Sequence, residues 1–140
     1  MDPLDPPPHA RHEVASDGET FVWQVRPGLA VERVTGVLTM PLAHCISDFL
    51  GPLLVPETKW CLFADFEGLT HYTREAREYL GTFSLEHLAA LDVIHFLISS
   101  KFVALGLSAY RDEIGEDHVR VYSDRASYLR SFEEMAQAPI

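Results

Sequence analysis

The stretch from Trp60 to Thr70 constrains the fold of this chain most. An uninterrupted apolar run, residues 60–64, is followed by two acidic residues, Asp65 and Glu67, then a glycine and a threonine. A continuous apolar run bounded by turn residues is typical of a strand buried on both faces of a sheet. Residues beyond the carboxyl end of such a strand lie at the edge where open α/β sheets place their functional groups. We therefore expect the functional surface to begin at Asp65.

Composition limits the classes of protein that this chain can represent. Its 140 residues are 47% hydrophobic and 23% charged, as in one ordinary globular domain. The longest strongly apolar stretch, Val93 to Leu107, is interrupted by polar residues and is shorter than the ~20 residues of a membrane span. We expect no membrane span and, because no basic-then-apolar leader is present, a cytoplasmic location. The net charge of −10 argues against a nucleic-acid ligand and favours a protein partner with a basic surface.

The chain divides into a proline-rich segment and a patterned domain. Residues 1–19 lack any apolar period, which predicts a disordered tail, and the domain is expected over residues 20–138. Apolar periodicity predicts strands at residues 20–26, 29–40, 60–64, 101–110 and 118–122, and helices at residues 41–50, 70–80, 84–98 and 124–136. The resulting order, β-β-α-β-α-α-β-β-α, predicts an α/β fold with a mixed sheet of four to five strands flanked by helices.

Two of these expected helices carry further predictions. Thr70 is expected to cap the helix that follows the central strand. The helix from Leu85 to Ile98 has apolar residues around most of its surface, which indicates either deep burial or contact with a second copy. A homodimer through this helix is therefore possible on the sequence.

The element order, the acidic loop after the third strand and the capped terminal helix together resemble the STAS superfamily, the fold of the anti-sigma-factor antagonists. The resemblance is greatest to small bacterial STAS-like proteins that are grouped with SEC14-type lipid-binding domains. It covers about residues 21–137 and rests on three stretches: residues 62–68, 93–101 and 124–126. What the resemblance implies is partner binding through the loop after the third strand and the start of the next helix.

The resemblance also implies a phosphorylation switch, which this sequence does not reproduce. In the antagonists, a serine or threonine directly after the loop aspartate accepts phosphate. Here Asp65 matches the aspartate and Gly68 the loop glycine, whereas Phe66 occupies the acceptor position. Thr70 is the nearest hydroxyl and the weak candidate for modification, although helix capping explains it without phosphate.

Catalytic chemistry has little support in the sequence. Asp65 and Glu67 after an apolar strand resemble the aspartate loop of haloacid-dehalogenase-type phosphatases, but a glutamate stands where the second aspartate belongs. His71 is the best-placed residue for acid–base work, yet no nucleophile accompanies it. Metal-binding signatures and phosphate-cradling glycine loops are absent from the sequence, so we predict no cofactor and no metal.

The sequence thus predicts a non-catalytic regulatory domain that binds a protein partner. The expected contact surface consists of residues around the central loop: Asp65, Phe66, Glu67, Gly68, Thr70, His71 and Tyr72. The alternative is a small-molecule or lipid-binding module with a pocket between helices and sheet, lined by the segments Leu42–Leu54 and Leu85–Ile98.

Overall fold

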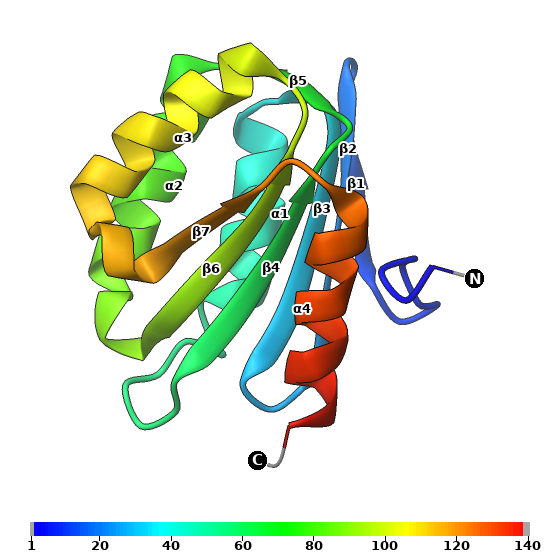
Figure 1. Cartoon of the computed structure of the whole chain (residues 1–140). Helices are drawn as coiled ribbons and strands as arrows, with labels where there is room; N and C mark the ends of the chain where they lie inside the picture. Colours follow the sequence, from blue (N-terminus) through cyan, green and yellow to red (C-terminus); the bar gives the residue numbers. More distant parts are fainter. Residues whose placement is uncertain (1, 139–140) are drawn as a thin grey trace.

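The chain forms one mixed sheet covered by helices on both faces (Figure 1). This structure, a computed structural model, describes residues 2–138. Its strands are β1 (Arg11–Val14), β2 (Gly18–Arg26), β3 (Leu29–Leu38), β4 (Trp60–Phe66), β5 (Leu69–Tyr72), β6 (Leu91–Ile98) and β7 (Val119–Tyr122). The helices are α1 (Met40–Leu50), α2 (Arg74–Glu86), α3 (Lys101–Ile114) and α4 (Arg125–Gln137), with short 3-10 turns η1 (Leu88–Ala90) and η2 (Glu116–His118).

The strands are ordered β1-β2-β3-β4-β6-β7, and β5 pairs with the far end of β3. The first three strands are antiparallel, whereas the pairs from β3 through β4 and β6 to β7 are parallel. The α/β class and the mixed sheet predicted from the sequence are confirmed, as is the hairpin of β2 and β3, which turns at Gly28 with a φ of 87°. The sheet has seven strands rather than four to five: β1, β5 and β6 were not recognised as strands, and the strand predicted at residues 101–110 is part of a helix.

The central position of the strand from Trp60 is also confirmed. All seven residues of β4 are buried, and the strand lies between β3 and β6. Parallel strands covered on both faces need apolar side chains on both faces, which explains the continuous apolar run. The run places Asp65 and Phe66 inside the strand rather than in the loop beyond it.

Two predicted elements between residues 84 and 110 were wrong in type. Leu91–Ile98, predicted as part of a helix, is strand β6, because its apolar side chains are buried on both faces of the sheet. Lys101–Tyr110, predicted as a strand, belongs to helix α3, which begins where the Ser100 hydroxyl accepts a hydrogen bond from the Val103 amide at 3.2 Å. The apolar Leu85–Ile98 helix, on which the expected dimer contact rested, is therefore not formed.

The segment predicted to be a disordered tail is ordered over residues 2–19. Arg11–Val14 forms the edge strand β1, paired with β2. Leu4 is fully buried, and the Asp2 carboxylate accepts two hydrogen bonds from the guanidinium of Arg125 at 2.7 and 2.9 Å. The lack of an apolar period in residues 1–19 did not indicate disorder, because this segment is held to the domain by one buried leucine and by charged contacts to residues distant in sequence. The folded unit therefore begins before residue 20.

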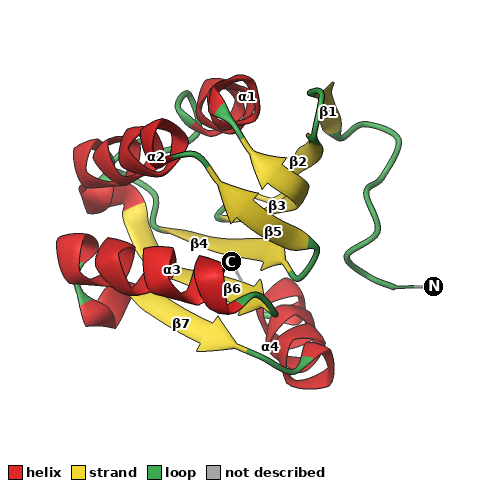
Figure 2. Cartoon of the chain, turned by 90° about the horizontal axis from the view of Figure 1, so that it is seen from above, coloured by secondary structure: helices red, strands yellow, loops and turns green. Residues whose placement is uncertain are grey.

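Each face of the sheet has its own hydrophobic core. Helices α1, α2 and α3 cover one face, and α4 covers the other (Figure 2). Successive strand residues point to opposite faces, so adjacent residues of β3 and β4 enter different cores. In β3, Ala30 and Val34 join the core under α1–α3, whereas Leu29 and Val31 join the core under α4. Because of this alternation, each buried strand residue contacts either the core under α1–α3 or the core under α4.

Candidate functional site

The acidic residue at the end of β4 is neutralised inside the protein. The Asp65 carboxylate, whose residue is 3% exposed, faces the α4 side of the sheet. It accepts hydrogen bonds from Arg33 Nε at 3.2 Å and from Arg125 Nη2 at 3.1 Å. Arg33 is its register partner on β3, and Arg125 is the first residue of α4. Two guanidinium groups therefore balance one buried carboxylate.

This ion-pair cluster also fixes the amino-terminal segment to the domain. Arg125 bonds to Glu67 at 3.0 Å and to Asp2 at 2.7 Å, in addition to Asp65. Arg33 donates to the Leu4 carbonyl at 2.7 Å. The neighbouring carboxylates of Asp65 and Asp2 raise the pKa of Arg125 despite its partial burial, so its charge is constant. The cluster is structural in character: it joins β3, β4, α4 and the amino-terminal segment.

The seven residues predicted to bind a partner do not form one exposed surface. Asp65 and Phe66 are buried at 3% and 8% exposure. Phe66 points to the α1–α3 side, where its ring meets that of Phe96 edge-on at 5.5 Å. Glu67, Gly68, Thr70 and His71 are exposed, and Tyr72 is half-buried. The predicted contact surface is thus divided among a core, a salt-bridge cluster and a small exposed part.

Thr70 does not cap a helix. It lies in β5, and its hydroxyl donates to the Gly36 carbonyl at 3.0 Å. The cap of α2 is Thr73, whose hydroxyl accepts a hydrogen bond from the Ala76 amide at 3.2 Å. His71 likewise lies in β5 rather than in a helical turn, next to the ring of Phe102 at 5.3 Å. A phosphate on Thr70 would therefore not lie at the N-terminus of the helix that follows it in sequence, α2.

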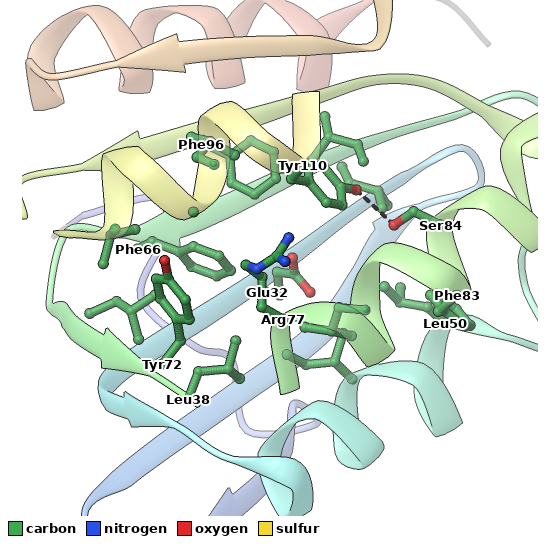
Figure 3. Close-up of a pocket in the computed structure, with 18 of the residues that line it drawn as sticks. Glu32, Leu38, Leu50, Phe66, Tyr72, Arg77, Phe83, Ser84, Phe96 and Tyr110 are labelled. Carbon is green, nitrogen blue, oxygen red and sulfur yellow. Dashed lines mark hydrogen bonds between the residues drawn. The ribbon is translucent and has the colours of Figure 1, made fainter. Parts of the chain in front are cut away.

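A pocket lies between the sheet and helices α1, α2 and α3 (Figure 3). Its volume is about 90 Å³. The lining is mostly aliphatic and aromatic, with side chains from every surrounding element, among them Leu38, Ile46, Leu62, Phe66, Tyr72, Leu80, Phe83, Ile94, Phe96, Leu107 and Tyr110. Two residues of the predicted contact surface, Phe66 and Tyr72, therefore belong to the wall of this pocket.

Four residues with polar side-chain groups besides Tyr72 also line the pocket. Ser84 of α2 and Tyr110 of α3 hydrogen-bond to each other at 2.7 Å, the contact drawn as a dashed line in Figure 3. Arg77 of α2 pairs with Glu113 of α3 at 3.4 Å. Both contacts join the two helices that roof the pocket. The remaining group is the carboxylate of Glu32.

Glu32 enters the pocket from the floor. It lies on β3 between Val31 and Arg33, and its side chain points to the α1–α3 side, as Figure 3 shows. The residue is 9% exposed, and among residues 2–138 no hydrogen bond or ion pair forms to its carboxylate. Burial in these apolar surroundings raises its pKa from 4.5 to about 7.

The roof of the pocket depends on a glycine of α3. Gly106 lies against the phenol of Tyr72, and a Cβ atom there would come within 2.8 Å of Tyr72 Cε1. The absence of a side chain lets Tyr72 pack under α3, where its ring stacks on Phe102 at 4.7 Å. Strand β5 and helix α3 thereby close one end of the pocket.

Glu32, Arg33, Arg77 and Arg125 were not predicted from the sequence to be functional residues. The sequence does contain a signal for the first two, because Glu32 and Arg33 interrupt a mostly apolar strand. The pairing of Arg33 with Asp65 depends on strand register between residues far apart in sequence. Local patterns carry no information about that register.

A further buried ionisable residue lies on the α4 side. His95 of β6 is 4% exposed, stacks on Phe63 at 4.2 Å and hydrogen-bonds through Nδ1 to the hydroxyl of Tyr122 at 2.9 Å. Burial, with a smaller effect of Arg120, lowers its pKa from 6.5 to about 4. His95 is therefore a neutral, hydrogen-bonded core residue at neutral pH.

Metal sites and membrane-spanning helices were both expected to be absent. In the part of the chain from residue 2 to residue 138, no cluster of three or more His, Cys, Asp or Glu side chains has the arrangement of a metal site. Over the same residues, the helices are all too short or too polar to cross a bilayer.

Comparison with known proteins gives a likeness of fold. The sequence matches no protein-family model and no curated protein. Among solved structures, the chain is similar to an uncharacterized protein of the DUF3478 family with a SpoIIAA-like fold from Shewanella loihica PV-4. The TM-score is 0.59 at 12% sequence identity, over 87% of this chain and 90% of that one. The likeness supports the STAS-like fold implied by the sequence, but not the SEC14-type branch; the chain shares the SpoIIAA-like fold.

Proposed function

We propose that this protein is a non-catalytic binding domain for a small, predominantly apolar molecule held between the sheet and helices α1–α3. The observation that carries the proposal is the pocket itself: an apolar cavity with few polar groups, one of them a buried carboxylate without a partner. Cores are normally packed without voids larger than a water molecule. A cavity of this kind in the centre of a domain is typical of a ligand site.

The size of the cavity limits the ligand. A volume of about 90 Å³ is about three times the ~30 Å³ that one molecule occupies in liquid water. It is smaller than the engineered cavity of ~150 Å³ that accommodates benzene. The present shape therefore fits an alkyl chain of about three carbons and not a ring of the size of benzene. A larger ligand requires α2 and α3 to separate, which would break the Ser84–Tyr110 hydrogen bond.

NMR titration of the protein with 1-propanol, which has fewer heavy atoms than benzene, tests the proposal. We expect shifts of amide signals in β3, β4, α2 and α3 and none in α4, which covers the opposite face. Val103→Phe, which adds a ring to the lining, should weaken binding strongly, whereas Val121→Phe at a 38% exposed position should not. Equal shifts on both faces, or binding unaffected by Val103→Phe in a folded variant, would contradict a ligand site here.

A second candidate function is the predicted partner contact, restricted to the exposed residues. Two large apolar side chains of α3, Phe102 at 43% and Leu105 at 71% exposure, lie on the helix next to His71. Exposed apolar groups beside polar ones are typical of protein contacts. With Glu67 and Thr70, this surface would suit a partner with basic groups, including a second copy of the chain.

Light scattering of concentrated protein tests the homodimer. A dimer through this surface predicts that Leu105→Glu lowers the measured mass to that of the monomer. The matched variant Val14→Glu, at a 62% exposed position of the edge strand β1, should leave the mass unchanged. If the wild type has the mass of a monomer, the surface would instead bind a different protein. We also propose, from the sequence, a cytoplasmic location and no binding to nucleic acid.

A further inference from the structure

The carboxylate of Glu32 indicates which chemical class of ligand fits the pocket. This inference rests on the proposed function and specifies its ligand. The residue is nine-tenths buried, lines the pocket and has no hydrogen-bond or ion-pair partner among residues 2–138. Buried polar groups in native proteins are nearly always paired, and an unpaired one requires an explanation.

Within residues 2–138, no ion pair compensates Glu32. The charged and titratable side chains that line the same pocket are Arg77 of α2, Tyr110 of α3 and Tyr72 of β5. Arg77 pairs with Glu113, and the Tyr110 hydroxyl pairs with Ser84. Although Figure 3 shows Arg77 pointing toward the pocket, its guanidinium lies beyond ion-pair distance of Glu32. The opposite face shows that the fold can supply arginines to a buried carboxylate, since Asp65 has two.

The rest of the lining suits a positive charge. Aromatic rings of four elements, Phe66, Tyr72, Phe96 and Tyr110, surround the space that the carboxylate faces. An ammonium group is attracted by aromatic faces and forms charge-assisted hydrogen bonds with a carboxylate. An anionic ligand would instead bring a second negative charge to Glu32 in a medium that screens it weakly.

We propose that the pocket selects compact apolar molecules that carry a primary amine, with the ammonium group bound by Glu32 and the hydrocarbon part held by the apolar lining. The raised pKa of Glu32, about 7, agrees with this geometry, because the empty pocket favours the neutral acid and a bound cation would favour the carboxylate. Acids of the same length are excluded by the same group.

The test compares three probes of equal chain length, each with fewer heavy atoms than benzene: propylamine, 1-propanol and propanoate. Their affinities for the full chain are measured by NMR titration at about pH 8, where Glu32 is mostly ionised. A hydrogen bond to a charged group contributes ~1.5–3 kcal/mol, so propylamine should bind at least about tenfold more tightly than propanol. Propanoate should bind more weakly than either. The preference for propylamine should decrease near pH 5, where Glu32 is protonated.

Two variants separate this inference from the proposed function. Glu32→Gln should abolish the preference for the amine while propanol binding remains. Glu57→Gln removes the same charge from an exposed loop and should preserve the preference. Equal affinity for amine and alcohol, or a preference unchanged in Glu32→Gln, would overturn the amine selectivity without affecting the pocket proposal. Preferred binding of propanoate would also overturn it, and failure of all three probes to bind would contradict the proposed function itself.

Discussion

The two faces of the sheet treat buried charge in opposite ways. Adjacent residues of β3 point to opposite faces, and they are Glu32 and Arg33. On the α4 side, Arg33 joins Asp65 and Arg125 in a cluster in which each charge has a partner. On the α1–α3 side, Glu32 faces an apolar pocket and has no partner among residues 2–138.

The difference separates a structural use of charge from a functional one. Breaking a buried ion pair is costly because an uncompensated charge remains, so the α4 cluster keeps four segments together. An unpaired buried carboxylate, in contrast, destabilises the fold that contains it. A stability cost at one residue of a pocket is typical of ligand sites, where a perturbed ionisable group serves binding rather than folding.

The largest expected effect comes from removing the charge at the centre of the α4 cluster. Asp65→Asn should lower the free energy of unfolding by about 3 kcal/mol, because Arg33 and Arg125 then lack their shared partner. Urea denaturation measures this change. Glu67→Gln is the matched control: its side chain is 45% exposed, so loss of its bond to Arg125 should cost under about 1 kcal/mol. Equal effects of both variants would show that burial does not distinguish the two carboxylates.

The opposite sign is expected on the pocket face. Burial raises the pKa of Glu32 in the folded protein to about 7 from its ordinary value of 4.5, so stability decreases as the pH rises through this window. Glu32→Gln removes this loss and should raise the free energy of unfolding by about 2–3 kcal/mol near pH 8. Near pH 4 the variant should match the wild type. A destabilised Glu32→Gln protein at pH 8 would mean that the carboxylate has a stabilising partner.

A third, smaller effect concerns His95 on the α4 side and appears in acid. The pKa of the folded residue, about 4, lies below the ordinary value of 6.5, so the unfolded chain binds a proton that the folded chain does not. Stability should therefore fall between pH 6.5 and 4. The loss is limited because a protonated ring can still donate Nδ1–H to Tyr122. His95→Gln should reduce the slope of stability against pH in this window; an unchanged slope would contradict the assignment.

The smallest effect tests the helix that roofs the pocket. Thr73→Ala should destabilise the protein by about 1 kcal/mol, because the Ala76 amide at the start of α2 loses its side-chain acceptor. Thr70→Ala removes an exposed hydroxyl that bonds to Gly36 and should cost less. Thermal unfolding measures both. A larger loss for Thr70→Ala would restore the original assignment of the cap.

Local sequence patterns predicted those parts of the fold whose causes are local. The hairpin follows from two β-rich runs around Pro27–Gly28, and β4 follows from a run that is apolar at every position up to Ala64. The run of Leu91–Ile98 is equally apolar, but such a run fits a buried helix and a buried strand alike, and its flanks were misread. The helix of Lys101–Ile114 was hidden by apolar residues on more than one side, including the exposed Phe102 and Leu105.

The candidate site was less predictable than the fold. Two residues of the predicted contact surface, Phe66 and Tyr72, line the pocket. Asp65 was assigned to an exposed contact because nothing local shows that Arg33 and Arg125 meet it from two other elements. Glu32 was overlooked for the same reason: its isolation is a property of the surrounding core, not of its neighbours in sequence.

The two outer strands of the sheet have a consequence for behaviour at high concentration. The outermost strands, β1 and β7, have four residues each, and both carry charged side chains, such as Arg11, Glu13 and Arg120. An approaching chain would find few free backbone groups to pair with and would have to desolvate these charges. Strand-by-strand polymerisation is thereby discouraged at both sides, so the domain can be concentrated with little tendency to form fibrils.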